Sequence, residues 1–323
     1  MTSKAQKPLL EIQNLEVTIK KRDILLRALD NLSFDLYPGE ILGLVGESGA
    51  GKSMTGSAIL GLIETPLFIS NGKIIFKGQQ IENNANSVRG SMISMIFQDP
   101  LVSLNPLRRI GEQLVETIRT HISLSKAEAT GYAMNLLEEV GIGKERFDAY
   151  PHTFSGGMRQ RVVIALALAP KPLLIIADEP TTALDVSVQA QILALLKRLC
   201  KERGTSIILI THDMGVIAET TDRVAVLYSG RLAEIGATSE VLSNPKHPYT
   251  RGLIAATPRI VADSFEQKLY QIPGIMPDLS DIPDGCPFHQ RCLESTSKCV
   301  EMKPPLLYGR ASCWLLENEN GMT

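Results

Sequence analysis

Residues 46–53 have the sequence GESGAGKS, which fits the pattern G-x-x-x-x-G-K-[ST]. An almost continuously apolar run precedes it and a helical pattern follows. In that context the glycines let backbone N–H groups converge on phosphate oxygens at a helix N-terminus. We expect Lys52 to reach the β- and γ-phosphates of a nucleotide, and the Ser53 hydroxyl to ligate Mg²⁺. A plain glycine-rich turn is the alternative, and the context disfavours it. The residues of this loop are Gly46, Glu47, Ser48, Gly49, Ala50, Gly51, Lys52 and Ser53.

Two adjacent carboxylates follow another apolar run, in LLIIADEP at residues 173–180. A buried strand there delivers Asp178 and Glu179 to its C-terminal end, the edge at which open α/β sheets bind ligands. Asp178 is predicted to hold Mg²⁺ through water, and Glu179 to orient or deprotonate an attacking water. For this pair alone a solvated strand end is an equal alternative. The phosphate loop earlier in the chain favours the catalytic interpretation.

Two further polar residues carry weaker signals. His212, in LITHD, follows an apolar strand pattern and therefore lands on the same edge, although a lone histidine there is more often structural. Gln98, in IFQDP, cannot be told from an ordinary surface glutamine by itself.

A second glycine-containing stretch, FSGGMRQRV, occupies residues 154–162. Ser155 is placed to cap a helix running to about Ala169, and Gly156 and Gly157 leave bare backbone N–H groups behind it, which is an anion-binding geometry. Most such triplets, taken alone, are loops. Because residues 46–53 already hold the chain's own nucleotide, the second stretch predicts a phosphate brought by another chain.

The elements that must position these residues alternate between strand and helix, which indicates a mostly parallel sheet with right-handed crossovers. The predicted strands are Ile41–Val45, Leu173–Ala177 and Ser206–Thr211, and the predicted helices begin near Lys52 and span about Ser187–Arg203, where Gly204 stops the second. Hairpins are predicted in GKIIFKGQQI and, turning at Ser229 and Gly230, in RVAVLYSGRLAEIG.

Residues 106–140 have a helical pattern instead. An apolar stripe consists of Leu107, Ile110, Leu114, Val115 and Ile118. Ser125 and Glu128 form a capping box for another helix, which Gly141 is expected to end. Beyond about Asn244 the chain is Pro-rich and irregular, and we expect an appended segment there.

Bulk composition narrows the class of protein. The chain has 323 residues, 44% of them hydrophobic, and a formal charge of 33 − 35 = −2, so no nucleic-acid or anionic-lipid surface is indicated. The start lacks the apolar region of a secretory signal, and the longest apolar run, Val162–Ala169, is far short of the roughly 20 residues that span a bilayer. We expect a cytoplasmic protein.

These motifs together resemble the nucleotide-binding subunit of an ATP-binding cassette (ABC) transporter over roughly residues 9–240. The matching motifs, in order, are Walker A at 46–53, the Q-loop Gln98, the signature 154–160, Walker B at 173–179, the D-loop Ala183–Asp185 and the switch His212. The resemblance implies an α/β fold: a P-loop (RecA-like) ABC ATPase core with an antiparallel β subdomain, an inserted α-helical subdomain at about 99–160, and an irregular C-terminal extension. The expected division is a nucleotide-binding domain at 1–243 and an extension at 244–323.

The resemblance also implies the roles of single residues. Glu179, His212 and Gln98 would be catalytic, and Ser53, Gln98 and Asp178 would ligate Mg²⁺. Two such domains pair head to tail, so that Ser155, Gly156 and Gly157 would contact the γ-phosphate of the ATP on the partner, and Asp185 of the D-loop would also bind nucleotide. The other implied partners are two transmembrane permease subunits and an external solute-binding protein, which would place the chain at the cytoplasmic face of the inner (plasma) membrane.

A narrower resemblance is carried by FQDPLVSLNPLRRIGEQL, by the signature variant FSGGMRQR, and by the tail that begins NPKHPYTRGLIAATP. These look like the ATPases of dipeptide and oligopeptide importers. Importers of nickel or metallophores, glutathione and antimicrobial peptides share much of this pattern and stay open as alternatives. So does a soluble ABC ATPase working on nucleic acid or ribosomes, although one cassette and the net charge disfavour it. The intact Asp178–Glu179 pair argues against a scaffold that binds nucleotide without hydrolysing it.

Three positions depart from the wider family. Phe154 and Met158 stand where Leu and Gln are usual in the signature, a change that the peptide-importer branch tolerates. The family usually has an aromatic residue that stacks on adenine near the end of the first strand. Ile19 stands at that position here, so no residue is assigned to the base.

Four of the five cysteines lie in the tail: Cys286, Cys292, Cys299 and Cys313. A cytoplasmic setting disfavours disulfides, and the spacing lacks the C-x₂₋₄-C pairs usual for zinc. Reduced thiols, zinc and an iron–sulfur centre therefore all stay open, and the resemblance to peptide-importer ATPases implies a [4Fe–4S] cluster. The fifth, Cys200, is expected to be a packing residue in a helix.

Overall fold

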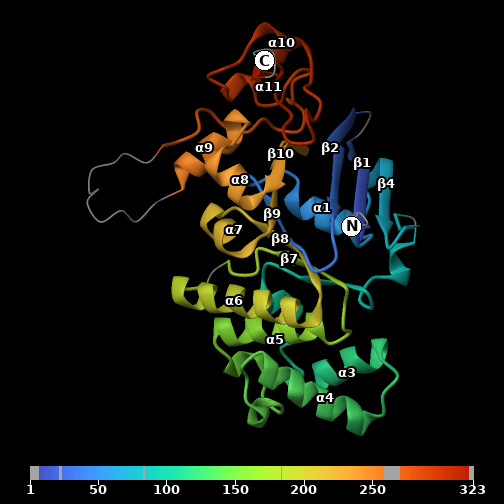
Figure 1. Ribbon diagram of the computed structural model, residues 1–323. Coiled ribbons are helices and arrows are strands. Elements are labelled where there is room, and N and C mark those ends of the chain that lie inside the picture. Colours follow the sequence, from blue (N-terminus) through green and yellow to red (C-terminus); the bar gives the residue numbers. More distant parts are fainter. Residues whose placement is uncertain (1–6, 22–23, 83, 183, 258–269, 320–323) are drawn as a thin grey trace, which may run out of the picture. The chain divides into compact units, whose positions relative to one another are not determined.

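The computed structural model describes residues 7–21, 24–82, 84–182, 184–257 and 270–319 (Figure 1). The chain divides into two compact units. The first comprises the described residues within 1–36, 42–83 and 211–323, and the second those within 37–41 and 84–210.

The first unit contains an antiparallel sheet in the order β2-β1-β4-β5. Buried side chains alternate along part of β1 (Leu10–Lys21), an inner strand of this sheet. Its residues Leu10, Ile12, Leu15 and Val17 are all at most 1% exposed. A positive φ at Asn14 accompanies a register shift that keeps Leu15 and Val17 on the buried face. The strands are β1 (Leu10–Lys21), β2 (Ile24–Leu36), β4 (Leu67–Phe76) and β5 (Gln79–Gln80). The antiparallel pairing of β4 with β5 confirms the hairpin predicted in GKIIFKGQQI.

The same unit carries a parallel pair that leads into the phosphate loop. All five residues of β3 (Ile41–Val45) are buried, as the sequence predicts, and β3 pairs in parallel with β9 (Arg223–Tyr228). β10 (Arg231–Ala237) returns antiparallel to β9 through Ser229 and Gly230, whose φ angles of 45° and 76° suit a tight hairpin turn. The second predicted hairpin is therefore confirmed.

The second unit is built on three parallel strands in the order β8-β7-β6. They are β6 (Ile93–Ile96), β7 (Leu174–Asp178) and β8 (Ser206–Thr211). Between β7 and β8 runs α6 (Val186–Arg203), which ends at Gly204 in the left-handed conformation, as expected. Cys200 lies buried on the inner face of α6, which confirms its packing role.

The helical part of the second unit follows β6. It consists of α2 (Pro100–Ser103), α3 (Ile110–His121), α4 (Lys126–Glu139) and α5 (Gly156–Leu168), and α5 lies between α6 and the α3–α4 pair (Figure 1). The capping box of Ser125 and Glu128 is present. The expected apolar stripe is correct at Ile110, Leu114 and Ile118 but wrong at Leu107, which is 85% exposed because it precedes the first turn of α3.

Short helices complete the first unit. They are α1 (Lys52–Ile59), α7 (Met214–Thr220), α8 (Thr238–Ser243), α9 (Pro248–Ala256), α10 (Ser297–Glu301) and α11 (Leu315–Glu319). The tail is therefore less irregular than the sequence suggests, since α9 forms behind the N-cap His247. Tyr249, Cys286 and Phe288 of the tail share one hydrophobic core with Val226 and Tyr228 of β9. Within the described residues, no helix is long and apolar enough to cross a membrane.

Candidate functional site: a phosphate loop and two carboxylates at a strand end

The phosphate loop connects β3 to α1 in the first unit. Gly51 is the N-cap of α1 with φ 99°, and as a glycine it supplies no side-chain capping hydrogen bond. Gly46 is required by close approach, because a Cβ there would lie 2.3 Å from the carbonyl oxygen of Leu227. The backbone N–H groups at the start of α1 therefore lie behind a glycine N-cap, at a helix N-terminus of the kind that binds anions.

Lys52 is folded onto this loop. Its ammonium donates hydrogen bonds to the carbonyl oxygens of Gly46 (2.8 Å) and Glu47 (2.9 Å), and the residue is only 6% exposed. Ser53, in contrast, is exposed at the first turn of α1. A cation and a hydroxyl thus stand at adjacent positions at the N-terminus of α1, which is the set that a nucleotide phosphate and its divalent ion need.

Two residues that contact the phosphate loop, Tyr249 and Arg291, were not predicted from the sequence. The backbone N–H of Glu47 donates to the Tyr249 hydroxyl at 2.8 Å, and its carboxylate is paired with Arg291. Nothing in the local pattern around Tyr249 or Arg291 indicates a link to the loop. The only sequence signal was the acidic residue inside a loop that binds anions.

In the second unit, β7 delivers the predicted carboxylates to its C-terminal end. Asp178 is the last residue of the strand and is 8% exposed. Glu179 follows with φ 45°, a left-handed conformation that costs a non-glycine residue energy and is typical of functional sites. Its backbone N–H donates to the carbonyl of Ile210 at 2.9 Å, which holds the turn against β8.

The carboxylate of Glu179 has two identified hydrogen-bond donors. The side-chain amide of Gln98 donates to Oε2 at 3.0 Å, and the Thr182 hydroxyl donates to the same atom at 2.9 Å. A carboxylate only accepts, so the amide nitrogen of Gln98 must face it. The structure therefore brings Gln98 and Glu179 together. A carboxylate held in this way can act as a general base toward a water molecule.

The signature segment forms the start of α5. Ser155 is its N-cap, and the serine Oγ accepts from the Met158 N–H at 3.3 Å, as predicted. Gly157 is packed closely, since a Cβ there would lie 2.6 Å from Val188 in α6. Asp185 is the exposed N-cap of α6, and Ala183 of the expected D-loop lies outside the described residues.

His212 lies in the first unit, directly after β8. It is exposed, and the neighbouring Asp213 caps α7 by accepting from the N–H groups of Gly215 and Val216. The sequence prediction that His212 follows a buried strand is therefore correct, and its catalytic role stays a prediction.

The four tail cysteines are close enough to influence one another's ionisation. Burial, followed by the neighbouring thiols, raises the pKa of Cys286 to about 12 and that of Cys313 to about 11. The backbone N–H of Cys286 donates to the carbonyl of Cys299 at 2.7 Å. Such thiols are protonated at neutral pH, whereas a metal requires thiolates.

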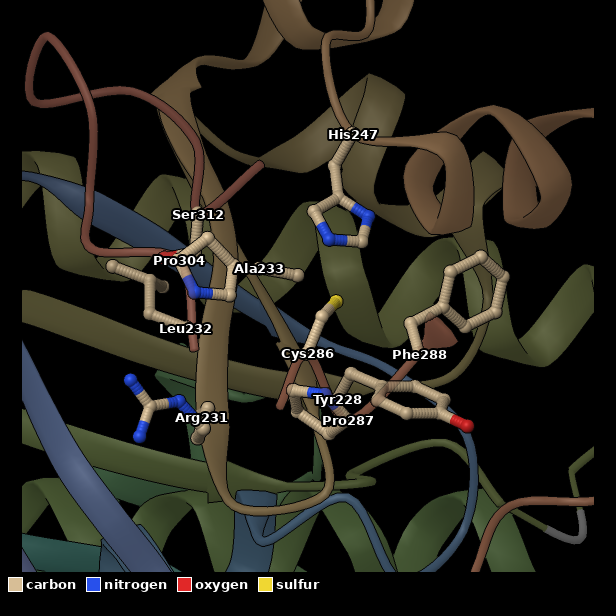
Figure 2. A pocket seen from close by; sticks show the side chains of 10 residues that line it. All are labelled: Tyr228, Arg231, Leu232, Ala233, His247, Cys286, Pro287, Phe288, Pro304 and Ser312. Carbon is tan, nitrogen blue, oxygen red and sulfur yellow. The ribbon is translucent and has the colours of Figure 1, made fainter. Parts of the chain in front are cut away.

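The arrangement of these cysteines does not fit a metal centre. Among the described residues, no group of three or more His, Cys, Asp or Glu side chains is placed to hold a metal ion. The small cavity beside Cys286, about 20 Å³, has room for about one water and is lined by only one of the four cysteines (Figure 2). The expected iron–sulfur centre is thus not supported by the side-chain positions.

The phosphate loop, the carboxylate pair after β7 and the serine-capped α5 define an ABC-type ATPase. Residues 29–182 match the ABC transporter family model, and residues 233–299 match the model of the oligopeptide/dipeptide transporter C-terminal region. The chain belongs to the family of ATP-binding proteins of oligopeptide and dipeptide ABC transporters.

Individual relatives agree with this assignment. The chain is 47% identical to the oligopeptide transport ATP-binding protein OppD of Haemophilus influenzae, over 95% of this chain and 97% of the relative. It is 44% identical to the dipeptide transport ATP-binding protein DppD of Bacillus subtilis, over 95% and 94%. Among solved structures, a dimeric ATP-binding cassette in a post-hydrolysis state, bound to ADP and Pi, matches with a TM-score of 0.63 and 27% identity. That match covers 71% of this chain and 98% of the other.

Proposed function

We propose that this chain binds and hydrolyses ATP to drive the import of oligopeptides or dipeptides across the inner (plasma) membrane, from a peripheral position on its cytoplasmic face. One observation carries the proposal. A cassette with a complete set of hydrolytic residue types continues, within the same polypeptide, into the C-terminal region typical of oligopeptide/dipeptide transporters. The proposed domain division is 1–243 for the cassette, with a helical insert at about 99–160, and 244–323 for the extension.

In this proposal the phosphate loop, residues 46–53, binds the ATP phosphates through its N–H groups and Lys52. Ser53, Asp178 and Gln98 offer the oxygen ligands that Mg²⁺ prefers, and the ion would neutralise charge on the phosphates when bound. Glu179 accepts a proton from the attacking water, and Gln98 keeps its carboxylate oriented. His212 is proposed as a further catalytic residue.

A second ATPase subunit, identical or paralogous, completes each ATP site. Ser155, Gly156, Gly157 and Asp185 are proposed to face the nucleotide of this partner, which the exposure of Ser155 and Asp185 supports. Two transmembrane permease subunits and an external solute-binding protein supply the pathway and the specificity. Closure of the ATPase pair on ATP would shift the permease between its access states. The size of this shift is limited by how much more tightly ATP binds the closed pair than the open one.

A finer proposal concerns the four tail cysteines. The family resemblance favours a [4Fe–4S] cluster, and the concentration of four thiols in the tail supports it. The present side-chain positions do not form the site, so the thiols would have to converge and lose their protons. Iron and sulfide analysis of anaerobically purified protein tests this, with about four irons per chain expected. A colourless, iron-free sample would leave reduced thiols or zinc.

The function is tested in proteoliposomes that contain this chain with its co-purifying ATPase, permease and solute-binding subunits. ATP-dependent uptake of labelled di- and oligopeptides is expected, together with peptide-stimulated phosphate release. Uptake of nickel, glutathione or an antimicrobial peptide in place of the peptides would identify one of the alternative importers. Stimulation of hydrolysis by nucleic acid or ribosomes, with no membrane subunits bound, would overturn the transport function.

A further inference from the structure

The second residue of the phosphate loop, Glu47, is held by residues of the C-terminal segment. Its carboxylate accepts two hydrogen bonds from one guanidinium group, from Arg291 Nη1 at 2.6 Å and Nη2 at 2.9 Å. Its backbone N–H donates to the Tyr249 hydroxyl at 2.8 Å, and its carbonyl oxygen accepts from Lys52. The N–H, carbonyl and carboxylate groups of Glu47 are therefore all engaged. Two of the three depend on residues more than 200 positions away.

Arg291 is fixed before it reaches the loop. It is only 7% exposed, and its Nε donates to the carbonyl of Pro273 at 2.8 Å. The guanidinium carbon lies 5.7 Å from the ring centre of Tyr228 and 5.9 Å from that of Phe288, which is cation–π range. The hydrogen bond to Glu47 raises the pKa of Arg291 further above its usual value, so the guanidinium is charged at any physiological pH. This is the two-pronged geometry in which arginine binds a carboxylate with fixed orientation.

Tyr249 is equally well anchored. It is completely buried, and its backbone N–H donates to Nδ1 of His247 at 3.0 Å, at the start of α9. Its ring meets that of Tyr228 edge-on at 4.7 Å, and Figure 2 shows Tyr228, His247 and Phe288 around the same pocket. The hydroxyl that receives the Glu47 N–H therefore cannot move without disturbing the core that joins the tail to β9.

A third contact reaches the tip of the loop. A Cβ built on Gly49 would lie 2.8 Å from the Met276 methyl group, so the tail packs directly against that glycine. The tail thus contacts the loop at Glu47 and at Gly49, and Lys52 donates to two carbonyl oxygens of the loop itself.

These contacts matter because Glu47 places a negative charge in a loop that must bind a polyanion. A carboxylate within a few ångströms of phosphate oxygens repels them unless it is neutralised and turned away. Arg291 does both. Tyr249 fixes the backbone N–H of Glu47. The carbonyl oxygen of the same residue accepts a hydrogen bond from Lys52, the cation that the phosphates need.

We propose that Arg291 and Tyr249 of the C-terminal extension are positioning residues for the phosphate loop, which set the affinity for ATP by holding Glu47. The inference rests on the proposed assignment of residues 46–53 to the ATP phosphates. In this role the extension is part of the nucleotide site and does more than append a separate domain to the cassette.

The test is an equilibrium titration of the full-length chain with MgATP and with MgADP, by calorimetry. We expect Arg291→Ala to raise the Kd for MgATP about tenfold, and Arg291→Lys to raise it by less, because lysine keeps the charge but not the two-pronged contact. In the reconstituted transporter, the KM for ATP should rise while kcat stays within about twofold, since the lost interaction serves binding. If Arg291→Ala does not fold, the same titration is made with Arg291→Lys, which is the milder change.

A double-variant cycle separates this role from a merely structural one. If Arg291 acts through Glu47, then in a Glu47→Gln background either Arg291 substitution should change the Kd by less than about twofold. An undiminished effect in that background would overturn the inference. So would a lowered melting temperature with unchanged Kd.

Lys303→Ala is the matched control. Lys303 also joins the extension to the cassette, through a 2.9 Å ion pair with Asp30, but does not touch the loop. Its Kd for MgATP should equal that of the wild type, and an equal rise would show general loosening and overturn the inference. Lys52→Ala distinguishes failure of the proposed ATP site from failure of the role assigned to Arg291. If Lys52→Ala binds MgATP as well as the wild type, the proposed site is wrong. If it does not bind while Arg291→Ala binds normally, only the role of Arg291 is wrong.

Discussion

The Gln98 amide donates a 3.0 Å hydrogen bond to the same carboxylate oxygen of Glu179 that accepts from Thr182. Glu179 is also held in a left-handed backbone conformation by its N–H bond to Ile210. Together these contacts orient the carboxylate before any water arrives, as a general base requires. Experiments can separate the two residues, because Glu179 is the proposed base and Gln98 the residue proposed to orient it.

Glu179→Gln should keep ATP binding and slow phosphate release by about 10²- to 10⁴-fold, since an amide cannot accept the water's proton. The paired form of the ATPase should accumulate with ATP bound, which size-exclusion chromatography can detect. Glu202→Gln, at an exposed position of α6, is the control. Phosphate release at the wild-type rate in Glu179→Gln would rule out the assigned role.

Gln98→Ala should lower kcat by about tenfold, less than the loss in Glu179→Gln, because Thr182 still holds the carboxylate. The measurement is steady-state phosphate release at saturating ATP. The double variant Gln98→Ala/Glu179→Gln should be no slower than Glu179→Gln alone. An additive loss would mean that Gln98 acts independently of Glu179.

Gly157→Ala should destabilise the protein by about 1–3 kcal/mol, because the new methyl group would crowd Val188. Gly131→Ala, in α4 with open space around it, should instead be neutral or stabilising by up to about 1 kcal/mol. Urea unfolding measures both.

Adding Val188→Ala to Gly157→Ala removes the crowding. Stability should return, whereas ATP hydrolysis by the assembled pair should stay low if a phosphate approaches the Gly157 backbone. Full recovery of hydrolysis would assign the whole effect to packing.

Acid should lower the folding stability of the protein, in part through protonation of Asp30. Burial alone would raise its pKa, but hydrogen bonds and charges from Lys303 and Arg231 outweigh burial and hold the pKa below the ordinary 3.8. A carboxylate with a lowered folded-state pKa contributes stability that is present above about pH 4 and is lost as the pH falls through the folded-state value.

Asp30→Asn should therefore cost about 1–3 kcal/mol at pH 7 and show a shallower loss of stability below pH 4 than the wild type. Thermal unfolding at pH 7, 5, 4 and 3 gives the comparison. Parallel curves for the two proteins would contradict the assignment.

The cysteines of the reduced, metal-depleted protein should alkylate in order of exposure and thiolate content. Burial raises the pKa of Cys200 and of Cys286 to about 12, and Cys292 is the least buried of the five. At pH 8, iodoacetamide should modify Cys292 first and Cys200 only after unfolding. Peptide mapping by mass spectrometry follows each site, and rapid labelling of Cys200 in the native protein would contradict its buried position.

Much of the local structure follows from the sequence. The buried strand Ile41–Val45, the stop of α6 at Gly204, the capping box of Ser125 and the hairpin at Ser229 and Gly230 are all predicted correctly. Each depends on periodicity, glycine conformation or capping within a few residues of itself. The phosphate-loop pattern and the carboxylates at the end of β7 belong to the same class, because short spacing determines them.

Tertiary structure alone decided the contacts that cross long stretches of chain. Leu107 matches the apolar stripe but lies before the helix that would have buried it. Gln98 meets Glu179 across 81 positions, and Arg291 meets Glu47 across 244. No local pattern predicts such pairs, because they depend on which strand ends are neighbours and on how a tail folds back onto its own core. The sequence thus determined which groups could bind a phosphate, and the tertiary structure decided which distant side chains hold them in place.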